Sequence, residues 1–309
     1  MASAKFNCFF TNAAHACAIV NRPEKLLDYP ITCPLARALR AARRLKIYER
    51  FPFAGGAMGR RSEYERGDSV RIDVLGVGFD NVTMEEAVER GMALLCGQGA
   101  HYVVTPNPEI VEICRKNPEA MRAVNGADLV LADGIGVIKG AQILGTPLKE
   151  RTPGVEFAAH LMERMAKEGL SLYLLGARPG VAEAAGKRLA EKYPGLCIAG
   201  SHDGYFQDDA PVLEAIRQSG ADAVFVCLGA PKQELWMERN AEATGARLLC
   251  GLGGSLDVFA GVVARAPKFW SDHGLEWFYR LCKEPRRIGR TMKLPLFLLH
   301  VFGARTRGK

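Results

Sequence analysis

The chain has 309 residues, and 48% of them are hydrophobic, so it is long enough and apolar enough to bury a substantial core. This composition excludes a disordered or fibrous protein. The net charge is +7, but a balance of +8, from eleven Lys or Arg against three Asp or Glu, lies between Arg265 and Lys309. A basic segment of this kind suits an anionic lipid surface or nucleic acid, and charge alone does not separate the two.

Targeting and cysteine patterns point to the cytoplasm. No run of 18 apolar residues occurs, and the first residues lack the basic and apolar regions of a signal peptide. The nine cysteines are scattered and no two form a C-x-x-C pair, so we expect reduced thiols rather than a zinc or redox site.

Three segments differ in their residue pattern. Residues 1–70 carry irregular apolar patches and an Arg-rich stretch, and we expect a variable or poorly ordered extension, with membrane contact by the basic stretch as the alternative. Residues 71–264 alternate between β-branched runs and amphipathic helical patterns, which predicts an α/β core. Residues 265–309 are basic and aromatic, and we expect an amphipathic helical appendage that associates with a membrane.

In chain order the pattern of residues 71–264 predicts strands separated by helices. This order is typical of an open, mostly parallel sheet covered by helices on both faces. A capping box at Thr83 and Glu86 marks one helix start, and four prolines suit first helical turns: Pro108, Pro153, Pro179 and Pro231. The predicted strands are Ile72–Val77, Tyr102–Thr105, Leu129–Ala132, Ser171–Leu175, Leu196–Ser201, Ala223–Leu228 and Arg247–Cys250.

The strand-to-helix loops are the segments to search for a site, because ligands of such sheets bind outside the carboxyl ends of the strands. Several of these loops combine glycine with a following helix start, which lets backbone N–H groups approach a phosphate. They begin at Thr105, Ala132, Gly176, Asp203, Gly229 and Gly251.

Three common nucleotide or metal motifs are missing. Gly76 and Gly78 are not followed by the third glycine of a dinucleotide fingerprint, and no G-x-x-x-x-G-K-[ST] or D-x-D motif occurs. We therefore expect neither a cofactor nor a metal ion. If a nucleoside diphosphate leaves during the reaction, loop amides and the cations Lys232 and Arg151 would stabilise its charge.

Asp133 follows an apolar strand and opens a glycine-rich turn into a helix. Two interpretations stand: a helix N-cap, or a general base that takes the proton of an acceptor hydroxyl. Thr105 and Asn107 have the same alternatives, since a polar strand-end loop can cap the next helix or bind a sugar or phosphate.

Leu294–Phe302 is an apolar run of nine residues, too short to span a bilayer. It either packs on the core or joins the basic and aromatic residues before it at a membrane interface.

Together these loops resemble the WecG/TagA/CpsF family of glycosyltransferases, known as glycosyltransferase family 26, over about residues 72–295. The resemblance is carried by five separated motifs in family order: Val104 to Glu109, Ala132 to Val137, Arg151 to Val155, Leu228 to Glu234 with Trp236, and Gly274 to Leu281 followed by Glu284 to Arg287.

The resemblance implies an inverting, metal-independent transferase of cell-envelope polysaccharide synthesis. It implies a UDP-sugar donor, typically N-acetylmannosamine, and an undecaprenyl-diphosphate-linked GlcNAc acceptor at the inner face of the cytoplasmic membrane. Asp133 would be the catalytic base, and Thr105, the second catalytic residue, would contact the donor near its sugar and diphosphate. The residues expected to bind substrates are Asn107, Arg151, Gly176, Tyr205, Lys232, Gln233 and Asp257, with Arg280, Arg287 and Arg290 facing the diphosphate groups.

Two alternatives stay open. A relative with the same fold could use UDP-glucose or UDP-glucuronate, and a noncatalytic nucleotide-binding protein could share the scaffold without needing Asp133 as a base. We expect no nucleic-acid partner, and a homo-oligomer is compatible with the sequence.

Overall fold

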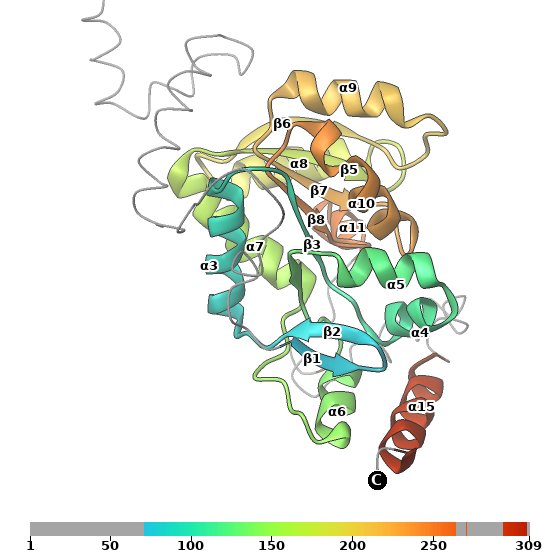
Figure 1. Cartoon of the computed structure of the whole chain (residues 1–309). Coiled ribbons are helices and arrows are strands. Elements are labelled where there is room, and N and C mark those ends of the chain that lie inside the picture. The colour runs from blue at the N-terminus through green and yellow to red at the C-terminus, as the bar shows by residue number, and fades with distance from the viewer. Residues whose placement is uncertain (1–70, 264–269, 271–292, 308–309) are drawn as a thin grey trace, which may run out of the picture.

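The computed structural model describes residues 71–263, Trp270 and residues 293–307. The interpretation of residues 1–70, and the positions of Arg280, Arg287 and Arg290, lie outside the described residues. The elements, labelled as in Figure 1, are β1 Arg71–Val74, β2 Val77–Asp80, α3 Met84–Cys96, β3 His101–Val104, α4 Pro108–Lys116, α5 Pro118–Asn125, β4 Leu129–Val130, α6 Ile135–Leu144, α7 Gly154–Glu168, β5 Ser171–Gly176, α8 Val181–Lys192, β6 Cys197–His202, α9 Asp209–Ser219, β7 Ala223–Cys227, α10 Lys232–Thr244, β8 Leu248–Gly251, α11 Ser255–Phe259 and α15 Lys293–Arg307.

The main sheet has six strands in the order β4-β3-β8-β7-β5-β6, and every neighbouring pair is parallel. The interior strands β5 and β7 are buried along their whole length, which fits their largely apolar sequences. The predicted open parallel sheet is confirmed.

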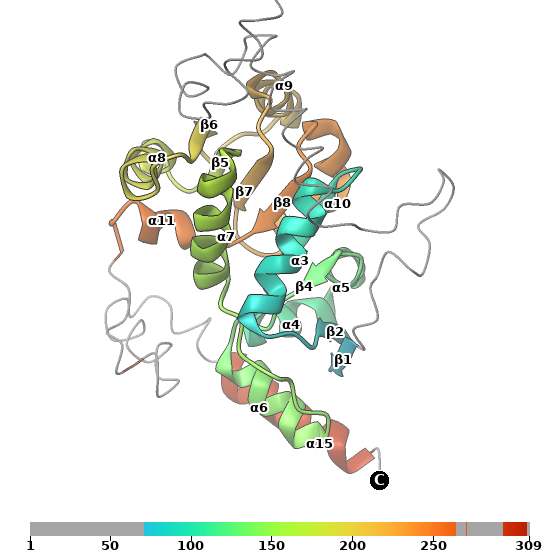
Figure 2. The same cartoon turned by 90° about the vertical axis from the view of Figure 1, so that its left-hand side faces the viewer.

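Helices cover both faces of this sheet (Figures 1 and 2). On one face, α3, α7, α8 and α11 enclose a core that includes Phe157 and Leu161. On the other, α4, α5, α6, α9 and α10 enclose a second core around Trp236 and Met237. The protein is therefore a three-layered α/β structure, as its alternating sequence pattern predicts.

The first predicted strand is wrong in one respect. Ile72–Val77 is not a single strand of the parallel sheet but part of an antiparallel hairpin in which Val74 pairs with Val77. Leu75 and Gly76 both have positive φ, at 57° and 92°, as the tight type I′ turn requires. An apolar leucine at the first turn position continues the apolar run, and this hides the turn in the sequence.

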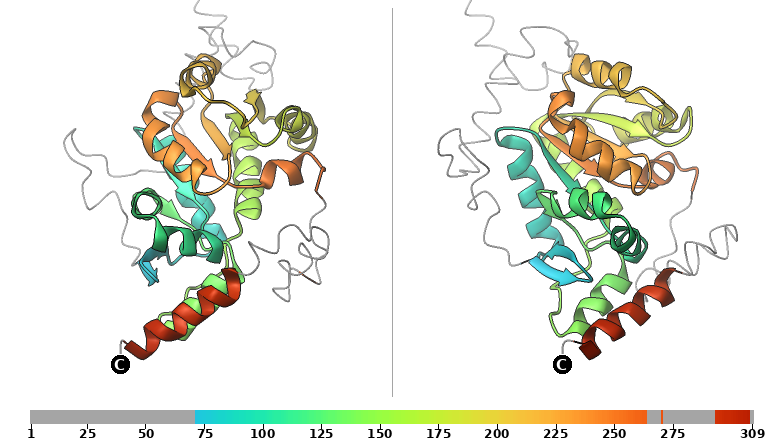
Figure 3. Two further views of the ribbon diagram at one scale, coloured as in Figure 1. Left: turned by 90° about the vertical axis from the view of Figure 1, so that its right-hand side faces the viewer. Right: turned by 45° about the vertical axis from the view of Figure 1, so that its right-hand side comes forward.

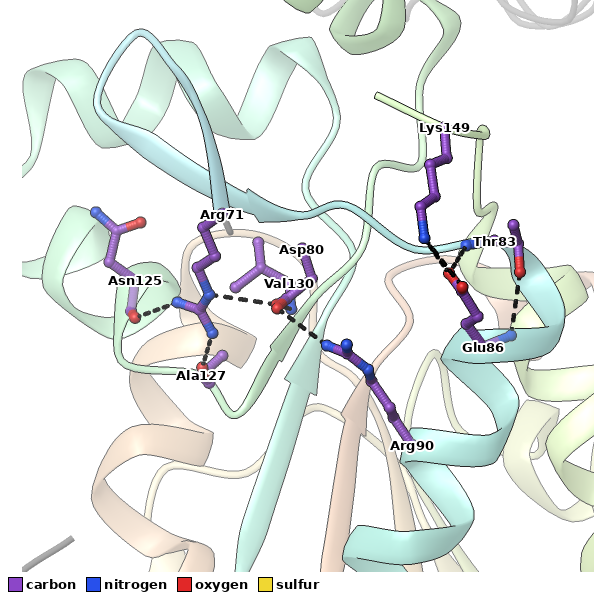
Figure 4. A network of polar contacts seen from close by, with 9 residues as sticks. All are labelled: Arg71, Asp80, Thr83, Glu86, Arg90, Asn125, Ala127, Val130 and Lys149. Atoms are coloured by element: carbon purple, nitrogen blue, oxygen red, sulfur yellow. Dashed lines mark hydrogen bonds and ion pairs between the residues drawn. The ribbon is translucent and has the colours of Figure 1, made fainter. Parts of the chain in front are cut away.

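The hairpin packs beside β4, the edge strand of the main sheet, and polar contacts join the two (Figure 4). Asp80, at the end of β2, is buried, and its Oδ2 accepts a hydrogen bond of 2.8 Å from the Val130 N–H. The guanidinium groups of Arg71 and Arg90 lie 3.3 and 3.6 Å from the same carboxylate, and Arg71 also donates to the carbonyl of Ala127 at 2.6 Å. A buried carboxylate with such partners fixes β4, the strand that leads to Asp133.

Two of the five predicted helix starts stand where the sequence places them. Thr83 and Glu86 form both hydrogen bonds of a capping box on α3, and Lys149 binds the Glu86 carboxylate at 2.9 Å (Figure 4). Pro108 is the first residue of α4. Pro153 and Pro231 instead precede the first helical residue by one position, and Pro179 precedes Val181 by two.

The C-terminal helix α15 packs on α6 and α4, and Figures 2 and 3 show it running alongside α6. Phe297 and Val301 are fully buried in the core around Trp236. Gly140 makes this possible, because a Cβ there would lie 2.9 Å from the Phe297 ring. The apolar run Leu294–Phe302 thus packs on the core along one side.

The opposite side of α15 is apolar as well. Leu299 is 68% and Phe302 is 53% exposed, and they stand one helical turn apart. Among the described residues, no helix has the length and apolar content that crossing a membrane would require.

Candidate active site

The helices that follow neighbouring strands change face at two places in the sheet. The neighbouring strands β3 and β8 are followed by α4 and α11, which pack on opposite faces of the sheet. The neighbouring strands β7 and β5 are followed by α10 and α8, which also pack on opposite faces. In open α/β sheets, ligands bind at the carboxyl ends of neighbouring strands whose loops lead to opposite faces. Of the sequence-predicted site residues, six lie at or after the ends of these strands: Thr105, Asn107, Gly176, Lys232, Gln233 and Asp257. Asp133 follows β4, Arg151 precedes α7, and Tyr205 follows β6.

Asp133 lies just after β4 and does not cap the helix that it precedes. The cap position of α6 is Gly134, with no side-chain hydrogen bond. Instead, Asp133 Oδ1 accepts a 3.0 Å hydrogen bond from the N–H of Gly154, the first residue of α7. The positive end of a helix dipole stabilises a carboxylate. The side chain is therefore held by a helix start twenty-one residues away, and it is only half-buried.

Thr105 directly follows β3 and is buried beside Gly154. Its hydroxyl donates a 2.9 Å hydrogen bond to the carbonyl of Gly251, at the end of β8. A Cβ on Gly154 would lie 2.9 Å from the Thr105 Oγ1, so only glycine allows α7 to begin so close to β3. Thr105 thus joins the ends of β3 and β8 and contacts Gly154, the residue that donates to Asp133.

Asn107 and Arg151 belong to the same group of loops. Asn107 caps α4, and its side-chain oxygen accepts from the Ile110 N–H at 3.1 Å. Arg151 is half-buried and precedes Thr152, whose N–H donates to the carbonyl of Ala132 at 2.9 Å. Both residues therefore lie beside the turn that carries Asp133.

Gln233 lies near the start of α10 and is only 1% exposed. Its Oε1 accepts from the Gly253 N–H at 3.0 Å, and its Nε2 donates to the Glu234 carboxyl at 2.7 Å. Through the Gly253 contact, the Gln233 side chain stabilises the turn that follows β8.

A second group surrounds the ends of β5, β6 and β7. Gly176 has φ +127°, and a Cβ there would lie 2.3 Å from the Cys227 carbonyl oxygen, so the two strand ends approach as only glycine permits. Lys232 Nζ donates a 3.2 Å hydrogen bond to the carbonyl of Gly204. The same ammonium group lies over the Phe206 ring, 4.6 Å from its centre, in a cation–π contact.

Two more predicted residues occupy the rim. Tyr205 follows Gly204 and is 72% exposed, with its backbone N–H bound to Asp203. Asp257 lies in the first turn of α11 and is half-buried.

The strand-end cysteines are poor nucleophiles. Burial raises the pKa of the Cys227 thiol to about 12, and burial likewise raises the pKa of Cys250. Across residues 71–263 and 293–307, no group of three or more His, Cys, Asp or Glu side chains could hold a metal ion.

Sequence reasoning missed two residues of this site. Gly154 was read only as part of a motif, although it donates to Asp133 and packs on Thr105. Glu234 was given no role, although it is 1% exposed and binds Gln233. A carboxylate in the first turn of a helix is ordinarily a solvated residue, so its burial had no signal in the sequence.

The loops after β3, β4, β7 and β8 thus meet around Asp133, Thr105 and Gln233, the arrangement of a ligand-binding α/β enzyme. Residues 72–309 match the sequence model of the family described as "Glycosyl transferase WecG/TagA/CpsF family". The chain belongs to this family of glycosyltransferases, as its motifs predict.

Relatives with a stated activity come from Staphylococcus aureus. The proteins of strains MW2, MRSA252 and NCTC 8325 / PS 47 are each described as an N-acetylglucosaminyldiphosphoundecaprenol N-acetyl-beta-D-mannosaminyltransferase. Each is 35% identical over 248 residues, which cover 79% of this chain and 97% of the relative.

Proposed function

We propose that this chain transfers N-acetylmannosamine from a UDP donor to a GlcNAc carried on undecaprenyl diphosphate, in cell-envelope polysaccharide synthesis. The observation that carries the proposal is the meeting of Asp133, Thr105 and Gln233 at one edge of the sheet, in a chain that covers 97% of a relative with that stated activity.

In the proposed reaction, Asp133 acts as the general base. Its carboxylate takes the proton of the acceptor hydroxyl as the oxygen attacks the anomeric carbon of the sugar. A new C–O bond forms to the acceptor, the bond to the UDP oxygen breaks, and the anomeric configuration inverts. The Gly154 hydrogen bond supports this role because it fixes the direction of the carboxylate.

The leaving UDP gains negative charge, and we propose that loop amides and cations stabilise it. Lys232 begins α10 and Arg151 lies in the loop that leads to α7, and we propose that Asn107, Gly176, Tyr205 and Asp257 complete the donor pocket. Thr105 and Gln233 are buried, so we assign their contribution to the shape of the turn after β8.

We further propose that Arg280, Arg287 and Arg290 bind the diphosphate groups. The start of α15 supports this assignment: Lys293 lies 3.2 Å from Glu109 in the first turn of α4, and Leu294 packs on Gly136 of α6. The chain therefore reaches α15 beside the helix starts that follow Asn107 and Asp133, and the arginines precede it in sequence.

The acceptor is a lipid, so we propose that the enzyme works as a peripheral protein at the inner face of the cytoplasmic membrane. The exposed pair Leu299 and Phe302 on α15, with the nearby Arg305 and Arg307, supports this location.

The decisive experiment incubates the purified full-length chain with separate UDP-sugars and a short-chain lipid-diphosphate-GlcNAc, and weighs the products by mass spectrometry. We expect one added N-acetylhexosamine from UDP-N-acetylmannosamine. Transfer only from UDP-glucose or UDP-glucuronate would correct the donor. Binding of UDP without transfer from any donor would favour a noncatalytic nucleotide-binding protein.

A further inference from the structure

Glu234 is a buried carboxyl group next to the proposed donor site. It is the third residue of α10 and is 1% exposed. Its Oε1 accepts from the Gln233 side chain at 2.7 Å, while its Oε2 is buried with no hydrogen-bond partner among the described residues. Burial raises the pKa of this carboxyl above its ordinary value, which favours the neutral acid.

The contact with Glu234 determines which way the Gln233 amide points. An amide has a donating NH₂ end and an accepting oxygen end of almost equal shape. The Glu234 Oε1 accepts a hydrogen bond from the NH₂ group of this amide, so the amide oxygen faces Gly253. That oxygen accepts a 3.0 Å hydrogen bond from the Gly253 N–H. A flipped amide would set two donors against each other at Gly253 and leave the backbone N–H unsatisfied.

The turn that this amide holds has little other freedom. Gly253 has φ +55°, and a Cβ on Gly251 would lie 2.6 Å from the Met237 side chain. On the other side, the Thr105 hydroxyl donates to the Gly251 carbonyl at 2.9 Å. The turn after β8 is therefore held between Thr105 and Gln233.

We propose that Glu234 is a positioning residue of the transferase, which orients the Gln233 amide and so holds the turn at Gly253 in the shape that donor binding needs. The inference rests on the proposed function, because it assigns this turn to the UDP donor. Glu234 itself touches no substrate.

The test compares three variants of the full-length chain. Glu234→Met keeps the length of the side chain but removes the accepting oxygen. Glu234→Gln keeps an accepting oxygen and cannot ionise, so it mimics the neutral acid. Glu238→Gln is the matched control, since Glu238 lies one turn further along α10 and pairs with Arg122 on the surface.

Two readouts are measured: hydrogen exchange at the Gly253 amide, and the Kd for UDP by titration calorimetry. We expect Glu234→Met to raise both about tenfold, the size of one lost hydrogen bond, and to leave the KM for the lipid acceptor unchanged. Glu234→Gln and Glu238→Gln should match the wild type.

Unchanged Gly253 exchange in a folded Glu234→Met variant would overturn the proposal. Equal defects in Glu234→Gln and Glu234→Met would also overturn it, because packing rather than the accepting oxygen would then matter. If Glu234→Met does not fold, Glu234→Ala removes the same accepting oxygen, and its Gly253 exchange must rise relative to Glu234→Gln. A wild-type chain that fails to bind UDP would instead refute the proposed function, while the exchange data would still decide whether Glu234 holds the turn.

Discussion

A single methyl group on Gly140 should loosen the C-terminal helix without unfolding the core. In Gly140→Ala the added Cβ would lie 2.9 and 3.0 Å from two carbons of the Phe297 ring and 3.3 Å from Val301. Phe297 and Val301 are fully buried, so the ring has no room to move away. Overpacking of this kind costs about 1–3 kcal/mol.

This cost falls on docking alone. Alanine improves the helix propensity of α6 by about 1 kcal/mol, but that gain applies whether or not α15 is docked. The two buried side chains contribute about 1.5–3 kcal/mol each to docking, so the clash removes a large share of it. The undocked population of α15 should rise roughly 5- to 150-fold, while the melting temperature of the core stays equal or increases.

Hydrogen exchange followed by mass spectrometry measures this directly, because exchange of the α15 amides reports the population of the open form. Gly303→Ala is the matched control, since a Cβ there meets nothing within 4 Å. Unchanged exchange of α15 in Gly140→Ala would refute the reasoning, and so would equal acceleration in both variants.

Four other outcomes are expected. Asp133→Asn should keep UDP binding, since its amide oxygen can still accept from Gly154, but lower turnover at least about 10²-fold in steady-state assays; wild-type turnover would remove Asp133 from the mechanism. Excess EDTA should leave activity intact, and full loss restored by Mg²⁺ or Mn²⁺ would contradict the metal-free mechanism. In urea unfolding, wild type should lose stability relative to Glu234→Gln as the pH rises above about 4.5, because the raised pKa keeps the folded acid protonated while the unfolded one ionises; a difference independent of pH would argue against this. Replacing Leu299 and Phe302 by Ser should weaken binding to anionic liposomes in a flotation assay, and unchanged binding would exclude this face from the membrane contact.

Local patterns predicted those parts of the fold that depend on neighbouring residues. The central strands β5 and β7 follow from short apolar runs, and the start of α3 follows from the Thr83 capping box. The hairpin was missed because Leu75 occupies a turn position that commonly holds Asn or Asp, so Gly76 alone did not mark the turn.

The site was predictable as a set of loops but not as a set of contacts. Motif order brought Asp133, Thr105 and Gln233 to one edge of the sheet, as a parallel topology requires. Their partners are separated by 21, 146 and 20 residues in the chain, and no local pattern encodes such pairings. Thr105 and Gln233 were expected to meet substrate, whereas their polar atoms bind the protein's own loops.

The carboxylate of Asp80 also affects how copies of this protein can meet. β4 is an edge strand, and such a strand offers outward N–H groups on which a second molecule can build a continuous intermolecular sheet. At Val130 that amide is already occupied by Asp80, and β2 lies alongside. Strand-to-strand association through this edge would first require the hairpin to peel away. Within the part of the chain that the structure describes, an assembly that leaves the hairpin in place therefore uses surfaces other than the β4 edge.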